Sequence, residues 1–206
     1  MSENKNAVVP QIRFKGYTDA WVQRKLGEVA EIIGGGTPDT TNPDYWDGDV
    51  DWYSPVEIGK EIYVYGSQRK ITELGLRNSS AKILPADRTI LFTSRAGIGD
   101  MAILKSPAAT NQGFQSLVVK ENYDVYFIYS AGNKIKEYAL KNAAGSTFLE
   151  ISGKNLAKME LYIPSLPEQT AIGDFFHNLD GQITAQAEKV EQLKRLKAAY
   201  LQKMFV

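Results

Sequence analysis

A sustained alternation of apolar and polar positions runs along the last forty residues of the chain. Apolar or aromatic side chains recur there in steps of four and three residues, which is the a/d pattern of a coiled coil. Pro167 suits the first turn of a helix, where its missing N–H is not needed. The pattern predicts one long helix over residues 167–206. Its apolar seam consists of Ile172, Phe176, Leu179, Ile183, Val190, Leu193, Tyr200 and Met204, with polar Gln186 and Lys197 completing the repeat.

This helix is too long to fit within a small domain. At 1.5 Å per residue, forty residues span roughly 60 Å, whereas a globular domain of this size has a radius of gyration of about 16 Å. The alternative is a core helix folded back on its own domain. The sustained repeat and the charged flanks favour a helix that projects and packs against another helix.

The preceding residues show shorter patterns separated by Gly and Pro turn signals. We predict strands at residues 50–53, 61–65, 89–93, 100–104, 114–119 and 158–163. Residues 72–80 and 123–142 have helical spacing, and residues 21–33 mix strand and short-helix character. The fold class is therefore α+β: a polar lead-in at residues 1–16, a globular domain at 17–166, and a coiled-coil helix at 167–206.

Composition narrows the class of protein further. The chain has no cysteine and one histidine, which excludes disulfides and thiolate metal sites and argues against a histidine-based metal site. No apolar run is long enough for a membrane span, and no secretory signal is visible. We expect a cytoplasmic protein without a bound metal. The whole chain is neutral, but residues 61–120 carry eight Lys/Arg against four Asp/Glu. This segment is therefore the candidate for a basic groove that binds phosphates.

Catalytic motifs are weak. Residues 42–45 approximate the Asn-Pro-Pro-aromatic motif of adenine methyltransferases, but aspartate replaces the second proline and a plain turn explains them better. Residues 97–99 form a Gly-x-Gly without the lysine and following helix of a phosphate loop. No nucleophile–base pair or paired carboxylate site can be argued, so we predict no catalytic residue.

Polar loop tips suit nucleic-acid recognition better. Arg can read guanine and Asn or Gln can read adenine by paired hydrogen bonds, while Ser and Thr hold phosphates. A glycine triplet permits a positive φ or a close approach of the backbone. Ordinary surface loops remain the alternative. The candidate DNA-binding residues are Gly34, Gly35, Gly36, Thr37, Arg69, Lys70, Ser94, Arg95, Asn111 and Gln112.

Taken in order, several stretches resemble one half of a specificity subunit of a type I restriction–modification system. They are residues 12–16 with Trp21, 25–29, 34–38, 91–99, 110–114, 163–169 and 179–180, and the ending 200–205. Members of this family usually carry two target-recognition domains, each followed by a conserved helical region. Their two long helices pack antiparallel and set the spacing between two DNA half-sites.

The resemblance implies a non-catalytic subunit that reads one half-site of double-stranded DNA and docks methylation subunits. A restriction subunit completes the complex, and S-adenosylmethionine and ATP are expected on partner subunits, with no cofactor on this chain. With one domain and one helix, an exposed seam implies a homodimer and hence an interrupted palindrome as target. Two alternatives stay open: an adenine methyltransferase fragment, and a coiled-coil oligomerisation adaptor that binds protein.

Overall fold

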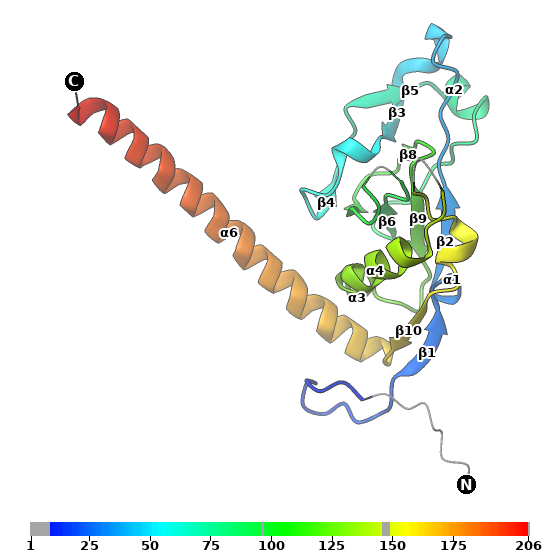
Figure 1. Cartoon of the computed structure of the whole chain (residues 1–206), viewed down its shortest axis with the longest axis vertical. Helices are drawn as coiled ribbons and strands as arrows, with labels where there is room; N and C mark the ends of the chain where they lie inside the picture. The colour runs from blue at the N-terminus through cyan, green and yellow to red at the C-terminus, as the bar shows by residue number, and fades with distance from the viewer. Residues whose placement is uncertain (1–8, 96, 146–148, 206) are drawn as a thin grey trace.

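The computed structural model describes residues 9–95, 97–145 and 149–205. A globular domain of short strands and helices is followed by one long helix that leaves the domain at an angle and projects into solvent (Figure 1). The predicted α+β class and the predicted C-terminal helix are both confirmed. The first eight residues of the predicted lead-in, and Val206 at the end of the predicted helix, lie outside the described residues.

Three sheets build the described part of the domain. β1 (Val22–Lys25) pairs antiparallel with β10 (Glu160–Ile163). The central sheet has the order β2-β9-β6-β7-β4, formed by Ala30–Gly34, Gln115–Val119, Thr89–Phe92, Met101–Leu104 and Tyr63–Val64. The third has the order β5-β3-β8, formed by Arg69–Ile71, Trp46–Tyr53 and Ala109–Thr110. The strands β5 and β8 were missed because they are only three and two residues long.

The middle of the central sheet is buried because β6 and β7 consist almost entirely of apolar residues. All four residues of β6 are buried, and short helices cover the sheet. These are α1 (Leu26–Val29), α3 (Val125–Ser130), α4 (Gly132–Asn142) and α5 (Gly153–Leu156). The third sheet has a separate small core with α2 (Glu73–Arg77), at the end of the domain far from β1 and β10 (Figure 1). Two 3₁₀ turns, η1 (Pro43–Tyr45) and η2 (Pro55–Glu57), flank β3.

The prediction of one continuous helix over residues 123–142 is wrong. Residues 123–142 form α3 and α4 rather than one helix, and the backbone turns at Ala131. A Cβ on the buried Gly132 would lie 2.0 Å from the Met101 Cε, so the glycine at the start of α4 leaves room for the Met101 side chain of β7. Asp124 caps α3 by accepting a hydrogen bond from the Phe127 N–H at 2.7 Å.

The long helix α6 runs from Leu166 to Met204. Its first turns contact α3, whereas every described residue from Gly181 onward is exposed. None of the described helices combines the length and apolar composition that crossing a membrane requires.

Candidate nucleic-acid interface and helix seam

The glycine triplet begins at the last residue of β2 and continues toward β3, and it packs closely against two other segments. The Gly36 N–H donates to the Thr110 carbonyl at 2.8 Å. A Cβ on Gly35 would come within 1.9 Å of the Asn111 carbonyl oxygen, and one on Gly36 within 2.3 Å of the Ser80 Oγ. Gly35 and Gly36 are therefore required by close packing of the backbone, and this loop is held in one position.

The loop around Asn111 and Gln112 lies directly against the glycine loop. The Thr37 hydroxyl is hydrogen-bonded to the Gln112 side-chain carbonyl. The Asn111 Oδ1 accepts from the Gly113 N–H at 2.7 Å, which fixes the turn, and Gln112 stays exposed. The structure thus brings residues 34–37 and 111–112 together on one surface, although they are far apart in the chain.

Two tryptophans on β3 hold the other side of this surface. The Trp52 Nε1–H donates to the Gly36 carbonyl at 2.8 Å, and the Trp46 Nε1–H donates to the Asp39 carbonyl at 3.1 Å. The two rings meet edge to face with centroids 5.2 Å apart. The guanidinium carbon of Arg69 lies 3.9 Å from the centroid of a Trp46 ring. A cation over an indole face is favourable and orients the guanidinium group, so exposed Arg69 is positioned beside the glycine loop.

Lys70 follows Arg69 on β5 and is also exposed. Its Nζ lies 3.6 Å from the Asp51 Oδ1. A surface pair of this kind is weak, so Lys70 can exchange this carboxylate for another anion. The two predicted phosphate contacts are therefore neighbours on one edge strand.

The other two neighbouring candidates, Ser94 and Arg95, differ in how far their side chains are exposed. Ser94 is 0 % exposed, and its hydroxyl has no hydrogen-bond partner among the described residues. It therefore does not reach the surface, and we remove it from the candidate interface. Its backbone N–H donates to the Gly113 carbonyl at 2.7 Å, which links this strand end to the Asn111 turn. The sequence pattern of polar loop tips could not reveal that the Ser94 side chain points inward.

Arg95 is half-buried, and its Nη1 lies 3.9 Å from the Glu150 Oε2. This separation is long for an ion pair, so the guanidinium group keeps donors for another partner. The residue after Arg95 lies outside the described residues. Residues Gly97 and Gly99 both have positive φ, which forms the tight turn between β6 and β7.

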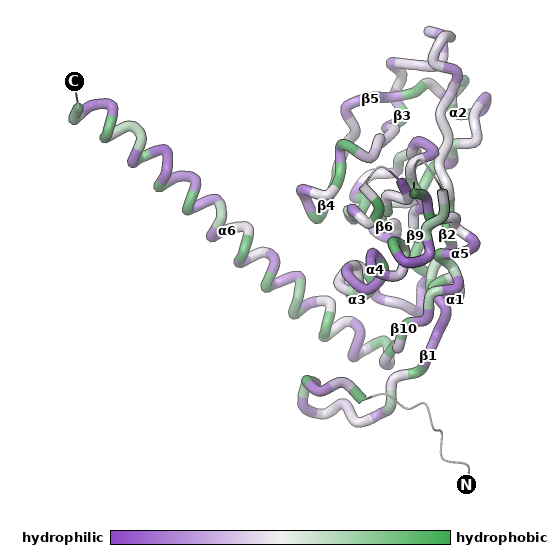
Figure 2. The backbone as a smooth tube through the Cα atoms, in the orientation of Figure 1, coloured by the Kyte–Doolittle hydropathy of each residue, from purple (hydrophilic) through white to green (hydrophobic). Residues whose placement is uncertain are grey.

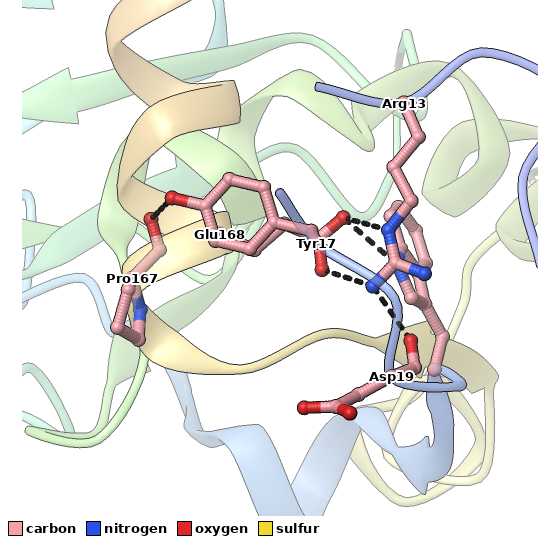
Figure 3. Close-up of polar contacts among 6 residues, drawn as sticks. Arg13, Tyr17, Asp19, Pro167 and Glu168 are labelled. Atoms are coloured by element: carbon pink, nitrogen blue, oxygen red, sulfur yellow. Dashed lines mark hydrogen bonds and ion pairs between the residues drawn. The ribbon is translucent and has the colours of Figure 1, made fainter. Parts of the chain in front are cut away.

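A network of polar contacts that the sequence interpretation missed anchors the root of α6. The Arg13 Nε and Nη2 donate to the two carboxylate oxygens of Glu168, both at 2.7 Å, in a forked pair (Figure 3). Trp21 also donates from Nε1 to Glu168 at 3.3 Å. Glu168 is only 1 % exposed. The Tyr17 hydroxyl donates to the Pro167 carbonyl at 3.2 Å (Figure 3).

The neighbouring Gln169 is the second buried polar residue of this turn. Its Nε2 donates to the Pro164 carbonyl at 2.9 Å, and its Oε1 accepts from the Asp124 N–H at 3.1 Å. The Glu-Gln pair after Pro167 thus joins α6 to the N-terminal segment on one side and to α3 on the other. These residues belong to stretches that the sequence resemblance used, and the structure gives them an architectural role.

A second set of contacts fixes the direction of α6 two to three turns further along. The Tyr126 hydroxyl donates to the Asp180 Oδ2 at 2.7 Å, and the Tyr63 hydroxyl lies 3.0 Å from the His177 Nδ1. Burial, followed by the hydrogen bond to Asp180, raises the pKa of Tyr126 above its ordinary value. His177, the single histidine of the sequence, therefore contacts the domain.

Beyond Asp180 the seam of α6 is exposed along its whole length. Apolar residues recur between polar ones from the domain to the far end (Figure 2). All of the predicted seam residues from Phe176 to Met204 are among the exposed large apolar side chains. The residues that face the domain, such as His177, Thr184 and Glu188, lie on the opposite side of the helix from the seam. The seam is therefore open to a partner.

Charge is distributed unevenly along the same helix. The first part, residues 166–188, contains four acidic residues and no lysine or arginine. The second part, residues 189–204, contains five basic residues and one acidic residue. The helix thus has an acidic half next to the domain and a basic half at its far end.

Within the described residues, no group of three or more His, Cys, Asp or Glu side chains could hold a metal ion. Residues 43–45 form the single turn η1, in which the Asn42 Oδ1 accepts from the Asp44 N–H at 3.0 Å. The stretch that approximates a methyltransferase motif is therefore a capped turn, as its composition predicts.

Comparison with known proteins gives consistent matches. A family model described as the type I restriction modification DNA specificity domain matches residues 18–195. The chain is 35% identical over 190 residues to the type I restriction enzyme MjaIX specificity subunit of Methanocaldococcus jannaschii, covering 90% of this chain and 44% of that protein. It is 31% identical over 189 residues to the EcoR124I/EcoR124II specificity subunit of Escherichia coli, covering 86% and 46%. The chain spans about half the length of these curated relatives.

Solved structures show the same fold. The HsdS subunit from Thermoanaerobacter tengcongensis matches with a TM-score of 0.64 at 16% identity, over 90% of this chain and 42% of that one. The S subunit of a type I restriction-modification system from M. genitalium matches with a TM-score of 0.63 at 18% identity, over 96% and 49%.

Proposed function

The chain belongs to the type I restriction–modification DNA specificity family, and from this premise we propose that it selects the DNA sequence on which such a complex acts. The match of the family model to residues 18–195 carries the proposal. In this role the chain itself performs no catalytic step. Methylation subunits that use S-adenosylmethionine, and an ATP-driven restriction subunit, supply the chemistry.

The surface around the glycine loop is the proposed reading surface. Asn111, Gln112 and Arg95 present side chains able to contact base edges, and Arg69 and Lys70 lie beside them as phosphate contacts. The loop glycines support this role because their packing fixes the loop against the Asn111 turn and, through Trp52, against β3. A reading surface needs this kind of support, since small displacements of a base-contacting group weaken discrimination.

We further propose that two copies of the chain pair through the seam of α6 in antiparallel orientation. An exposed stripe of large apolar side chains on a single helix favours association. The charge distribution supports the orientation, because antiparallel pairing brings the acidic half of each helix against the basic half of the other. Parallel pairing would instead place like charges together.

The seam also has a register that fits this orientation. Antiparallel coiled coils pair a positions of one helix with d positions of the other. A two-fold axis at residue 188 pairs Phe176 with Tyr200, Ile183 with Leu193, and Gln186 with Val190. The same register places Asp180 close to Lys194 of the second copy, where their charges attract. In this register every a position of one helix faces a d position of the other.

A two-fold dimer reads a symmetric site. Each domain contacts one half-site, and the paired helices set the separation between the halves, so the expected target is an interrupted palindrome. The proposal that methylation subunits dock on the outer face of the helices rests on the family resemblance. The adenine methyltransferase fragment and the protein-binding adaptor are not favoured, because the matched family is one of DNA specificity domains.

Selection of DNA tests the proposal. The chain, assembled with its methylation subunits, is incubated with a pool of random duplexes at moderate salt, and the retained DNA is sequenced. We expect a defined motif that methylation subunits alone do not enrich, with binding that weakens as salt is raised. Enrichment of the same sequences without this chain would contradict the proposal.

A further inference from the structure

Beside the root of α6 the surface contains two adjoining apolar hollows, which we call the base groove. One, of about 540 Å³, is lined chiefly by Ile12, Phe14, Phe175 and Phe176. The other, of about 490 Å³, lies between α6, the α3–α4 junction and β10. Trp21, Ile172 and Phe176 line both hollows. Together they form a continuous apolar surface that the single chain does not fill.

The outer wall of the base groove is the N-terminal arm, residues 10–16. The arm has no helix or strand, yet the fork between Arg13 and the buried Glu168 fixes it to α6. Phe14 packs edge to face on Phe175, with ring centroids 5.7 Å apart. Ile12 nevertheless remains 92 % exposed. Two apolar side chains are thus held in place beside the helix, one of them with almost no contact of its own.

The base groove continues the seam of α6. Ile172 and Phe176 are the first two seam positions, and both belong to the lining of the groove. The arm contacts one side of the helix through Glu168 and Phe175, and α3 contacts the other side near Gly173. The seam emerges between these two walls. Whatever packs on the seam near the domain must therefore enter the groove.

We propose that the base groove receives the last turns of α6 from a second copy of this chain, so that the N-terminal arm is part of the dimer interface. This inference rests on the antiparallel pairing in the proposed function. In that register Met204 of the second copy lies at the level of Ile172, and Tyr200 at the level of Phe176. Tyr200, Met204 and Phe205 are all exposed in the single chain.

The chemistry of the two surfaces matches. The groove offers aromatic and aliphatic side chains, and the end of α6 supplies a tyrosine, a methionine and a phenylalanine. Methionine packs well against aromatic rings because its thioether is polarisable. Lys203 of the second copy falls at the level of Gly173, two residues from Phe175, and its long side chain can place the ammonium group over that ring. The acidic first turns of α6 add attraction for the basic end of the incoming helix.

A conservative substitution in the arm tests the contact. Ile12→Ala removes exposed apolar atoms and no contact that the domain needs, so the fold should be unchanged. We expect the dimer dissociation constant, measured by sedimentation, to rise at least about tenfold, because both symmetric grooves lose this side chain. The matched control is Val56→Ala, since Val56 is 87 % exposed on η2 and away from α6. An unchanged dissociation constant for Ile12→Ala would overturn the inference.

Cross-linking tests this contact separately from dimer formation. Because the chain has no native cysteine, only the introduced cysteines react. A chain with Phe14→Cys and a differently tagged chain with Met204→Cys are co-expressed and treated with a short bis-maleimide. The inference predicts a 14–204 cross-link between the two chains. Ala187→Cys reports separately on pairing of the two helices, because this position meets its own copy near the two-fold axis.

The combined outcomes separate the two claims. Cross-linking through Ala187→Cys without any 14–204 product would leave the pairing of the helices intact and overturn the role of the base groove. Loss of both products, with a monomer in sedimentation, would overturn both proposals. A 14–204 cross-link between the two chains, together with a raised dimer dissociation constant for Ile12→Ala, supports the inference.

Discussion

Leu193 offers a quantitative test of the seam. It occupies a d position in the exposed part of α6, and in the antiparallel register it packs against Ile183 of the second copy. Burying a whole leucine side chain contributes about 2 kcal/mol. Leu193 is 56 % exposed in the single chain, so burying this exposed part of the side chain contributes about 1 kcal/mol in each copy. Because each dimer contains two such contacts, Leu193→Ala should cost about 2 kcal/mol of association free energy.

That loss corresponds to a rise of roughly 30-fold in the dimer dissociation constant. Sedimentation equilibrium over a concentration range that spans dissociation measures it directly. Leu140→Ala is the matched control, because Leu140 is a 47 % exposed leucine on α4 and lies off the seam. The free energy of unfolding of both variants should stay close to that of the parent chain.

Two results would refute this reasoning. If Leu193→Ala and Leu140→Ala changed the dissociation constant equally, the seam would not be the contact surface. If the parent chain sedimented as a monomer at micromolar concentration, no homodimer would exist for the substitution to weaken.

Further predictions concern the reading surface and the core. Arg95→Ala should relax specificity at one base position and cost about 1–3 kcal/mol of binding free energy there. Arg69→Ala should instead weaken binding to all sequences and reduce the salt slope by about one. Sequencing of bound DNA at several salt concentrations measures both effects. Gly36→Ala should destabilise the fold by about 1–3 kcal/mol in urea unfolding, because its Cβ would meet the Ala81 backbone N at 2.4 Å; Gly34→Ala, which would meet only the Gln115 side chain at 3.5 Å, is its control. Tyr53→Phe should stabilise the fold by about 1 kcal/mol, because the buried hydroxyl has no partner in the described part of the chain.

Tyr53 also predicts a dependence of stability on alkaline pH. Burial raises the pKa of this tyrosine to about 12 from its ordinary value of 10.0. The folded state therefore keeps the proton longer than the unfolded state does, and stability contributed by the neutral form is lost as the pH rises from 10 to 12. Tyr53→Phe should remove this part of the pH dependence of unfolding. An identical alkaline profile in the variant would contradict the assignment.

The long helix could be predicted from the sequence because its signal is repeated over forty residues. The strands of the central sheet were also recognisable, since their apolar runs are bounded by turn residues. By contrast, β5 and β8 contain too few residues to show a period, and Arg69 on β5 was noticed only for its charge. Its position over Trp46 depends on a pairing of distant strands that no local pattern reports.

The arrangement of the proposed reading surface was predictable in part for a related reason. Glycine reveals a close approach of the backbone, so the triplet marked a packed loop, and Asn111 and Gln112 proved to lie against it. Ser94 shows the limit of this approach, because loop position alone cannot tell whether a side chain points outward. Arg13 and Glu168 were equally hidden, since a buried ion pair between residues 155 positions apart leaves no sequence spacing to detect.

The most direct test of the account is a map of methylated sites in DNA from cells that express this chain together with its methylation subunits. The account predicts a single interrupted palindrome whose two halves are identical, and loss of that methylation when the seam is broken by Leu193→Asp. An asymmetric motif, or methylation that persists when this chain is omitted, would contradict it.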